Sequence, residues 1–408
     1  FFNSELKDNF YVINPPFNVN IINLTIKHIM NNLKKFKTNI IIFLPTWDLS
    51  NKLADRGIKV YVSTTNANGS SRLAVKRNRF IQKHHNLFVK YYHEQLINRF
   101  SLAFIFGIWS DIKKADVVYI QYLFHYTVLF SLLFSLLQGK ETLICPRGSF
   151  SRFTLSNRFP LIKLAWLKLV IKPFSRSIKW HASSNLEKRD IIRELGHASV
   201  QVVNDGVDFT SFQEFKKCKR NTLLEKYTHT QFKDVSSIFF SMGRLHSIKS
   251  FDILIDAFSL FIKEQKKAKL IIAGGDDGVG EKLKQQILDL ELEDSIFLIG
   301  AINFKDKKDL LNNCDYFTLA SKFESFGIVI AEALSCGKPI VLSNKTPWRD
   351  LEEKKCGILV NDEKSIFANA FSEIMKLKYN SQLIKNYVKD NYDWDIIAVS
   401  FLAIIRKK

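Results

Sequence analysis

Two glutamates stand eight positions apart in the stretch "KFESFGIVIAEALSCG", at Glu324 and Glu332. The apolar run "YFTLAS" before them is typical of a buried strand, and "IVIAEALSC" is typical of a helix that ends at Gly337. In a parallel sheet, ligands bind at the carboxyl ends of strands, where free N–H groups of the next helix favour anions. Gly327 lets the backbone approach a phosphate because it has no Cβ. We therefore expect Glu324 to contact a sugar and Glu332 to accept hydrogen bonds from a ribose diol.

Glutamates at this spacing are more often a loop charge and an ordinary helix residue, so a second element has to support the site. Arg244 and Lys249 lie in "SMGRLHSIKSFDILIDAF", just after an apolar strand and before a helix. Two cations at the same edge of the sheet could neutralise a diphosphate leaving group. The alternative is that both are solvated surface charges. The two elements together favour a nucleotide-sugar site.

The elements that would position these residues follow a regular order in the second half of the chain. Runs such as "SIFFSMG", "KLIIAGG", "YFTLAS" and "PIVLSN" alternate with helical segments, which predicts right-handed βαβ units and a parallel sheet covered on both faces. The first half is less regular. There "KVYVSTTNANG", "DVVYIQYLF" and "TLICPRGSF" indicate strands, a helical region is expected over 160–174, and "KWHASSNLEKRDIIREL" indicates a strand end, a serine cap and a helix. Two α/β halves meet near "VVNDGVDF".

Composition sets the outer bounds. A hydrophobic share of 46% with 25% charged residues is typical of a soluble globular protein, and five scattered cysteines argue against a disulfide framework or a zinc site and suit a reducing compartment. The most apolar stretch, Tyr126–Gly139, is shorter than the roughly 20 residues that a bilayer requires, so a buried helix is expected. No signal peptide pattern opens the sequence. We expect a cytoplasmic protein, with peripheral attachment to the cytoplasmic membrane face as an option.

The formal net charge of +20 admits three partners: nucleic acid, an anionic membrane surface or a phosphorylated substrate. Nucleic acid is disfavoured because no compact arginine-rich tract or nucleic-acid motif is present. A solvated lysine-rich surface and attraction to a membrane surface both stay open. The stripe "RFPLIKLAWLKLVIKPFSRSIKW" has the same two interpretations, a helix on an anionic membrane or a buried helix with basic edges.

The combination of "GRLHSIK", "IIAGG" and "ESFGIVIAE" resembles the retaining GT-B glycosyltransferases of family 4, over about residues 50–408. The resemblance implies two Rossmann-like domains with parallel sheets facing across a cleft, and a donor held mainly by the C-terminal domain. It implies that Arg244 and Lys249 bind the diphosphate, that Glu324 contacts the donor sugar and that Glu332 binds the ribose. The backbone around sugar, phosphates and nucleotide would come from Ser325, Phe326, Gly327, Ile328, Gly274 and Gly275.

The N-terminal half carries weaker matches to the same family. "CPRGSF" matches its PRG element, which implies that Arg147 and Gly148 line the cleft. "HASSNLEKRDI" matches a serine-rich loop before a Glu-bearing helix, with Ser183, Ser184 and Glu187 at those positions, and "NDGVD" resembles the hinge-side NGVD. Many members carry a His that touches the donor sugar, where this sequence has Gln121. His125 could substitute, or it could have a helix-face or core role.

The family's glycine-rich first loop is not recognisable. Instead, "NPPF" at Asn14–Phe17 resembles the signature of cap-adenosine N6 methyltransferases, in which Asn and Pro hold an exocyclic amine and the aromatic ring stacks on the base. No glycine-rich S-adenosylmethionine loop follows it. Residues 1–48 are therefore interpreted as a remnant, from a gene fusion or a misassembled reading frame. Alternatively, or in addition, "NIIIFLP" replaces the missing first strand of the sheet.

The expected domains are the segment of residues 1–48, an N-terminal acceptor domain of 49–203, a C-terminal nucleotide-sugar domain of 204–390 and a final helix of 391–408 that packs back toward the N-terminal domain. The expected function is retaining transfer of a sugar from a UDP- or GDP-linked donor to a glycan or lipid-linked acceptor, in surface polysaccharide or glycoconjugate synthesis. No cofactor or metal is expected, and Asp276 and Asp277 are interpreted as turn residues. The alternatives are a GT-B pseudoenzyme and a nucleic-acid adenine methyltransferase.

Overall fold

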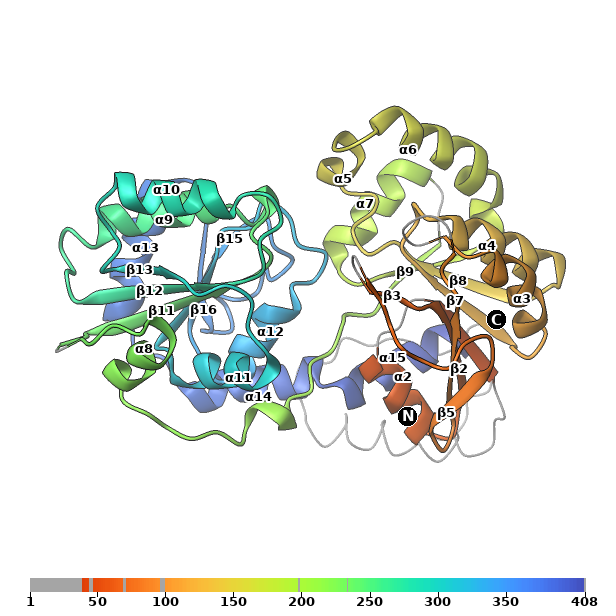
Figure 1. Ribbon diagram of the computed structural model, residues 1–408, viewed down its shortest axis with the longest axis horizontal. Coiled ribbons are helices and arrows are strands. Elements are labelled where there is room, and N and C mark those ends of the chain that lie inside the picture. The colour runs from red at the N-terminus through yellow and green to blue at the C-terminus, as the bar shows by residue number, and fades with distance from the viewer. Residues whose placement is uncertain are drawn as a thin grey trace, which may run out of the picture. The chain divides into compact units, whose positions relative to one another are not determined.

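The computed structural model describes residues 39–43, 47–68, 71–95, 100–196, 199–232 and 234–406 (Figure 1). Contacts between residues divide the chain after Lys37, so that residues 38–408 form one unit. The NPPF tetrad lies outside the described residues. None of the described helices combines the length and the apolar character that crossing a membrane requires.

The first half of this unit is built on an eight-stranded sheet with the order β10-β9-β8-β7-β1-β2-β6-β5. All neighbouring strands are parallel except β5 and β6, which form an antiparallel pair. The strands of this sheet are β1 (Asn39–Phe43), β2 (Lys59–Thr65), β5 (Phe80–His84), β6 (Leu87–Tyr92), β7 (Val117–Gln121), β8 (Glu141–Cys145), β9 (Lys179–Ala182) and β10 (Val200–Val202). The short strands β3 (Ala67–Asn68) and β4 (Ser71–Arg72) pair separately.

Strand β1 occupies a central position in the sheet, although it lies in the part of the sequence that departs from the expected family pattern. Its register aligns Asn39 with Lys59 of β2, and Ile40 with Val117 of β7 on the other side. The prediction that "NIIIFLP" supplies the missing first strand is therefore confirmed. The expected domain boundary after residue 48 falls inside the next helix, α2 (Trp47–Asp55), because β1, α2 and β2 form one continuous βαβ unit.

Helices cover both faces of this sheet. One face carries the core cluster that includes Phe104, Val128, Leu167 and Ile191. The helices on that face are α3 (Leu102–Ile112), α4 (Tyr126–Leu137), the short π-helix η1 (Leu167–Ile171) and α7 (Asn185–Leu195). The apolar α4 buries Val128 and Leu132, whereas Leu137 at its end is 65% exposed, so the expected buried helix is buried along one side. Helices α5 (Arg152–Ser156), α6 (Pro160–Trp166) and the 3-10 helix η2 (Lys172–Ser177) complete this half.

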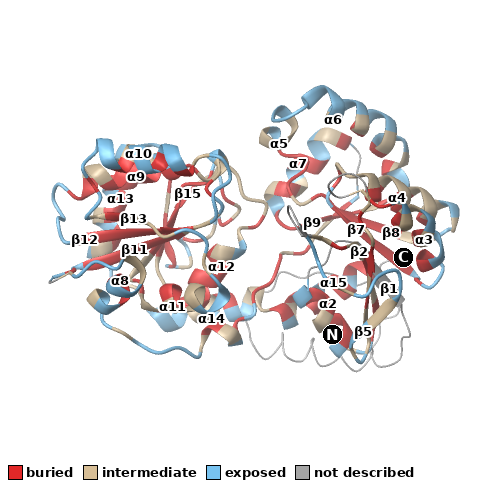
Figure 2. Cartoon of the chain, in the orientation of Figure 1, coloured by how far each residue is buried: buried red, intermediate tan, exposed pale blue. Residues whose placement is uncertain are grey.

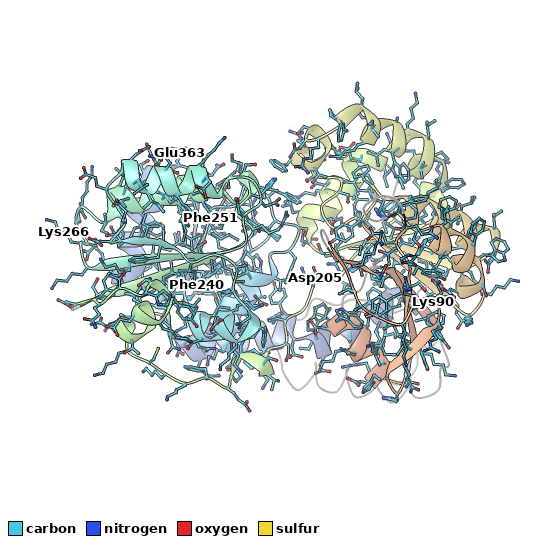
Figure 3. The ribbon with its side chains drawn as sticks, viewed as in Figure 1. Lys90, Asp205, Phe240, Phe251, Lys266 and Glu363 are labelled. Carbon is cyan, nitrogen blue, oxygen red and sulfur yellow. The ribbon has the colours of Figure 1, made fainter. Side chains whose placement is uncertain are left out.

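The second half is built on a fully parallel six-stranded sheet with the order β13-β12-β11-β14-β15-β16. Its strands are β11 (Ser237–Met242), β12 (Ala268–Ala273), β13 (Ile296–Leu298), β14 (Tyr316–Leu319), β15 (Ile340–Ser343) and β16 (Gly357–Val360). Burial on both faces explains why these strands are continuous apolar runs in the sequence. Phe240 and Phe251, labelled in Figure 3, belong to the two separate core clusters of this half.

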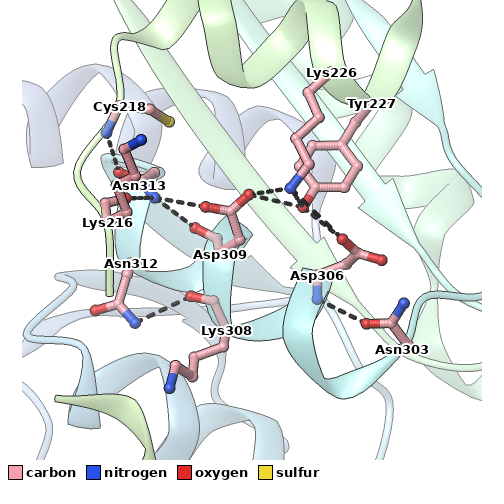
Figure 4. Close-up of polar contacts among 10 residues, drawn as sticks. All are labelled: Lys216, Cys218, Lys226, Tyr227, Asn303, Asp306, Lys308, Asp309, Asn312 and Asn313. Atoms are coloured by element: carbon pink, nitrogen blue, oxygen red, sulfur yellow. Dashed lines mark hydrogen bonds and ion pairs between the residues drawn. The ribbon is translucent and has the colours of Figure 1, made fainter. Parts of the chain in front are cut away.

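Each cluster of the second sheet is closed by its own set of helices (Figures 1 and 2). One cluster includes side chains of α9 (Phe251–Phe261), α10 (Gly280–Asp289) and α13 (Lys364–Lys376). The other includes side chains of α8 (Arg220–Thr228), α11 (Phe304–Asn313), α12 (Ile328–Ser335) and α14 (Ser381–Tyr392). Polar contacts also join α8 to α11, because Lys226 and Tyr227 both bond to Asp309, at 2.6 and 2.9 Å (Figure 4). This network fixes the helix that carries Lys307.

The last helix, α15 (Trp394–Arg406), packs against the first half of the chain. Phe401 contacts the rings of Tyr119 and His181, with ring centroids 4.9 and 5.6 Å apart. Asp395 pairs with Lys52 of α2 and with Arg56, which directly follows that helix, each at 2.8 Å. The helix therefore adds core residues to the first sheet after the chain has completed the second.

Buried His181 on β9 is predicted to make the fold less stable in acid. Tyr119 Oη bonds to its Nδ1 at 2.9 Å, Nε2 bonds to Val203 O at 2.7 Å, and burial lowers the pKa of His181 from 6.5 to about 4. As the pH falls through 6.5 the unfolded chain takes up a proton, whereas the folded chain does so only near 4. The free energy of unfolding should therefore fall across this window, by up to about 3 kcal/mol.

Urea unfolding at pH 7 and pH 5 measures this effect. The variant His181→Gln should lose less stability between the two pH values than the unmodified chain. The exposed His229 supplies the control, because His229→Asn should keep the full acid effect. An unchanged pH dependence in His181→Gln would assign the acid effect to other groups.

Candidate functional site

The carboxyl ends of β11 and β14 carry the loops in which the sequence places its cations and its first glutamate. The loop after β14 enters α12 through Gly327, whose φ of 83° lies in the left-handed region. This conformation favours glycine, and a Cβ at this position would stand 2.7 Å from Ile330 Cδ1, so that side chain would have to shift. Helix N-termini favour anions because most N–H groups of the first turn lack an intrahelical partner, and the N-terminus of α12 lies at this edge of the sheet.

Lys249 and Glu324 meet at this edge. Lys249 ends the 3-10 helix η4 (Ser247–Lys249) after β11, and its Nζ lies 2.5 Å from Glu324 Oε1. Ser321 Oγ donates to the same carboxylate oxygen at 2.7 Å. The side chains of Lys249 and Glu324 are only 15% and 12% exposed, so water screens their attraction weakly. A bound diphosphate or sugar would compete with this pair for the same charges.

Arg244 lies on the same loop but faces outward. Its side chain is 70% exposed and pairs with the half-exposed Asp277. The neighbouring Asp276 accepts hydrogen bonds from the N–H groups of Gly278 and Gly280 at 3.0 and 2.8 Å, which lowers the pKa of its carboxyl group. Asp276 therefore stabilises the turn into α10, as the sequence predicted. The side chain of Asp277 instead holds the guanidinium of Arg244.

Gly274 and Gly275 follow β12 and contact the Arg244 loop. A Cβ at Gly274 would stand 1.7 Å from Gly243 O, which no side chain could accommodate. Gly275 O accepts a hydrogen bond from Leu245 N at 2.9 Å. The glycine pair thus allows two backbone segments to cross closely beside the loop that carries Arg244.

Glu332 lies one turn into α12 and is 7% exposed. Its Oε1 is 2.5 Å from Nζ of Lys307, which comes from α11. Burial raises the pKa of Glu332, opposed by the attraction of Lys307, and the nearby Asp48 of α2 raises it further. Lys307 was not predicted from the sequence, because it is one of several lysines in "FKDKKDLL" and belongs to a different βα unit.

The remaining residues of the predicted donor loop have different environments. Phe326 is 2% exposed, packs against the rings of Trp348 and Tyr392, and accepts a hydrogen bond on its carbonyl from Trp348 Nε1 at 2.7 Å. Phe326 therefore fixes the donor loop to Trp348 and Tyr392. Ser325 is half-buried, and Ile328 at the start of α12 is 46% exposed.

In the first half of the chain, Arg147 lies in a buried ion pair. It has a left-handed φ of 52°, its Nε donates to Gln121 Oε1 at 3.2 Å, and its guanidinium pairs with both carboxylate oxygens of Asp205. Burial opposes the charge, but the attraction of Asp205 raises the pKa of Arg147. Among the described residues, Gln121 Nε2 has no hydrogen-bond partner, although Gln121 is only 3% exposed. Asp205 was not singled out from the sequence.

Glu187, in the first turn of α7, links that helix by hydrogen bonds to the PRG loop, Pro146–Gly148. Its carboxylate accepts hydrogen bonds from Gly148 N at 2.5 Å and from both N and Oγ of Ser183 at 2.7 Å. Burial raises its pKa, opposed by these hydrogen bonds. Ser184 caps the helix through its Oγ, which accepts from Glu187 N at 3.1 Å. Ser183 Oγ also lies 3.3 Å from the carbonyl of Ser325, in the donor loop.

His125 has the helix role that the sequence left as one of its alternatives. It is the N-cap of α4, and its Nδ1 accepts from Thr127 N at 3.4 Å. Its ring also contacts the ring of Tyr126 in a tilted arrangement, with centroids 4.5 Å apart.

The second half of the chain matches known proteins. Residues 227–391 match the family model for glycosyl transferases group 1. This region contains Arg244, Lys249, Glu324 and Glu332, together with Gly274 and Gly275. The glycosyl transferases group 1 match thus covers the second sheet and the whole of the predicted donor site.

Two relatives of known activity align with the chain. The alpha-1,3/1,6-mannosyltransferase ALG2 of Dictyostelium discoideum is 30% identical over 195 residues, which cover 43% of this chain and 46% of the relative. The GDP-mannose:cellobiosyl-diphosphopolyprenol alpha-mannosyltransferase of Komagataeibacter xylinus is 22% identical over 254 residues, covering 60% and 61% of the two chains. The chain thus aligns with about half the length of these curated relatives.

The solved structure of HepE from Anabaena, in complex with UDP and glucose, superposes with a TM-score of 0.70. The superposition covers 91% of this chain and all of HepE, at 18% sequence identity. The fold is therefore GT-B, with two Rossmann-like sheets, as predicted. The comparisons give no support to the methyltransferase resemblance of the N-terminal segment.

Proposed function

We propose that the chain is a retaining glycosyltransferase that moves a sugar from a nucleoside-diphosphate sugar to a glycan or lipid-linked acceptor. The observation that carries the proposal is the convergence of Lys249 and Glu324, 2.5 Å apart at the carboxyl edge of the second sheet, beside the N-terminus of α12. The family match over 227–391 and the UDP complex of HepE support a nucleotide-sugar donor.

In the proposed mechanism, the second sheet holds the donor and neutralises its leaving group. Lys249, Arg244 and the N–H groups at the start of α12 attract the diphosphate. Glu324 binds a hydroxyl group of the sugar, and Glu332 binds the ribose by exchanging its contact with Lys307. The bond between the anomeric carbon and the phosphate oxygen breaks, and the leaving oxygen accepts the proton of the acceptor hydroxyl. That hydroxyl oxygen then bonds to the anomeric carbon on the same face.

The acceptor is proposed to meet the first sheet. Arg147, Gly148, Gln121 and Ser184 lie at the carboxyl ends of β7, β8 and β9, which is the ligand-binding edge of a parallel sheet. A lipid-linked acceptor is supported by the K. xylinus relative, whose name specifies a diphosphopolyprenol substrate. Surface polysaccharide or glycoconjugate synthesis at the cytoplasmic membrane face is proposed as the setting.

Donor turnover tests the proposal. The purified chain is incubated with UDP-, GDP- and ADP-linked sugars, and release of the nucleoside diphosphate is measured with and without glycan or lipid-linked acceptors. We expect one base to support release, and Lys249→Met to lower it by about a hundredfold or more, because a leaving-group charge contact is worth several kcal/mol. Lys284→Met is the matched control, since Lys284 lies exposed on α10 and pairs only with Glu281 among the described residues.

A pseudoenzyme is the second candidate, and one observation favours it. Gln121 replaces the family's histidine, and its carboxamide oxygen is already engaged by Arg147. Nucleotide binding without turnover of any donor would establish this candidate. The variant Gln121→His should then restore measurable release if the missing imidazole is the cause.

A further inference from the structure

The helix that follows α5 has an apolar face that no element among the described residues covers. It runs through α6 and η1, and its inner side buries Leu167 and Ile171 in the core of the first sheet. Its outer side carries side chains that are 58–80% exposed, and Figure 2 shows α6 as exposed along its length. These are Phe159, Leu161, Ile162, Leu164 and Leu169, here called the α6 face. The sequence of this segment allowed two interpretations, a helix on an anionic membrane or a buried helix with basic edges. In the structure, only one side of the helix is buried.

The charged side chains of the segment that carries the α6 face all have the same sign. No Asp or Glu lies between Glu141 and Glu187 in the sequence. Arg158, Lys168 and Lys172 are exposed beside the apolar side chains, as is Arg176 in the next turn. An apolar face whose own segment carries cations and no carboxylates is complementary to a surface that offers both acyl chains and negative charge.

One lysine of the segment points inward and stabilises its shape. Lys163 Nζ donates to the carbonyl groups of Thr154 and Asn157 at 2.6 and 2.5 Å, and it lies 5.7 Å from the ring of Phe124. These contacts tie α6 to the end of α5 and turn this ammonium group away from the apolar side. The face that remains outward is therefore more apolar than the sequence alone indicates.

A highly exposed apolar helix face suits a lipid surface better than a protein partner. Large exposed apolar patches on a soluble fold mark interaction sites, because water contact with so much apolar area is unfavourable. Side chains exposed by up to 80%, as Leu161 is, stand out from their surroundings and can enter a fluid boundary without a matching groove. The neighbouring lysines and arginines have long side chains that reach phosphates in the headgroup layer.

We propose that the α6 face inserts into an anionic lipid bilayer surface, with Arg158, Lys168, Lys172 and Arg176 bound to headgroup phosphates. The inference does not depend on the proposed transfer reaction, because no donor or acceptor takes part in it. Its consequence is that the PRG loop, which ends where α5 begins, lies near the membrane when the protein is attached.

Vesicle flotation of the full chain tests the proposal. Vesicles of phosphatidylcholine alone are compared with vesicles that also contain phosphatidylglycerol, at low and at physiological salt. We expect binding to the anionic vesicles, weakened by salt because screening shortens the reach of the lysines. The double variant Leu161→Ser/Ile162→Ser should bind about tenfold or more weakly. Lys168→Gln/Lys172→Gln should bind about fivefold more weakly for each lysine.

The matched control is Leu288→Ser/Lys282→Gln, which removes an exposed leucine and an exposed lysine from α10 on the second sheet. It should bind as the unmodified chain does, and all variants should keep their thermal midpoints. Equal flotation of the α6 variants, or no binding of the unmodified chain to anionic vesicles, would overturn the proposal. Dimerisation that the α6 variants abolish, without vesicle binding, would show that a second copy covers the face and would overturn it equally.

Discussion

Replacing Glu332 with alanine is expected to weaken nucleoside-diphosphate binding by about tenfold to a hundredfold. Glu332 is the buried carboxylate of α12, and a ribose diol can donate two hydrogen bonds to it. Hydrogen bonds to charged groups contribute about 1.5–3 kcal/mol each, and part of this is lost in exchanging the contact with Lys307. Thermal-shift titration with UDP, GDP and ADP measures the effect, because a ligand that binds only the folded state raises its stability.

The control for this prediction is Glu281→Ala, which removes an exposed glutamate from α10. It should leave the nucleotide response unchanged. Lys307→Met separates the two partners of Glu332: it should leave a free carboxylate and so preserve, or improve, ribose binding. If Glu332→Ala responds to nucleotide as the unmodified chain does, the ribose assignment is wrong. S-adenosylmethionine is included in the same titration, and stabilisation by it would revive the methyltransferase alternative.

Replacing Glu187 with alanine is expected to lower the free energy of unfolding by about 3–5 kcal/mol. Glu187 is 1% exposed and accepts three hydrogen bonds, from Gly148 N and from N and Oγ of Ser183. Removing the acceptor leaves buried donors without a partner, and each such group costs about 1–3 kcal/mol. Urea unfolding at neutral pH measures the loss.

The control is Glu194→Ala on the same helix, where the carboxylate pairs with the partly exposed Arg193 and should contribute less than about 1 kcal/mol. Glu187→Gln tests the chemistry more finely, because its amide nitrogen would face a backbone N–H donor and should not restore full stability. A Glu187→Ala variant as stable as the Glu194→Ala variant would show that the PRG loop is held by other contacts.

The fold of the second half was predictable because its strands are buried on both faces. "SIFFSMG" and "KLIIAGG" became β11 and β12, since continuous apolar runs bounded by glycine leave few alternatives. The region over 160–174 was predicted as helical. The change from α6 to a short π-helix and then to a 3-10 helix was not predicted. Pro173 removes a backbone donor there, and how the chain adjusts depends on packing that no local pattern encodes.

The candidate site was predictable where its residues share one sheet edge. Lys249 and Glu324 each follow a recognised strand, so their approach could be inferred from topology. Lys307 and Asp205 were missed because their partners, Glu332 and Arg147, lie in other βα units and far away in the sequence. Ion pairs between different βα units depend on how the elements pack. The sequence around one lysine among several does not indicate which carboxylate it contacts.

The position of α15 determines the order in which the two sheets can complete their cores during synthesis. Phe401 fills the core beside Tyr119 and His181, yet it leaves the ribosome only after every strand of the second sheet. During translation the apolar residues of the first sheet that α15 covers therefore stay exposed until α15 has been synthesised. The second sheet can bury both of its faces earlier. Nascent chains released before α15 should expose this surface to chaperones or to aggregation.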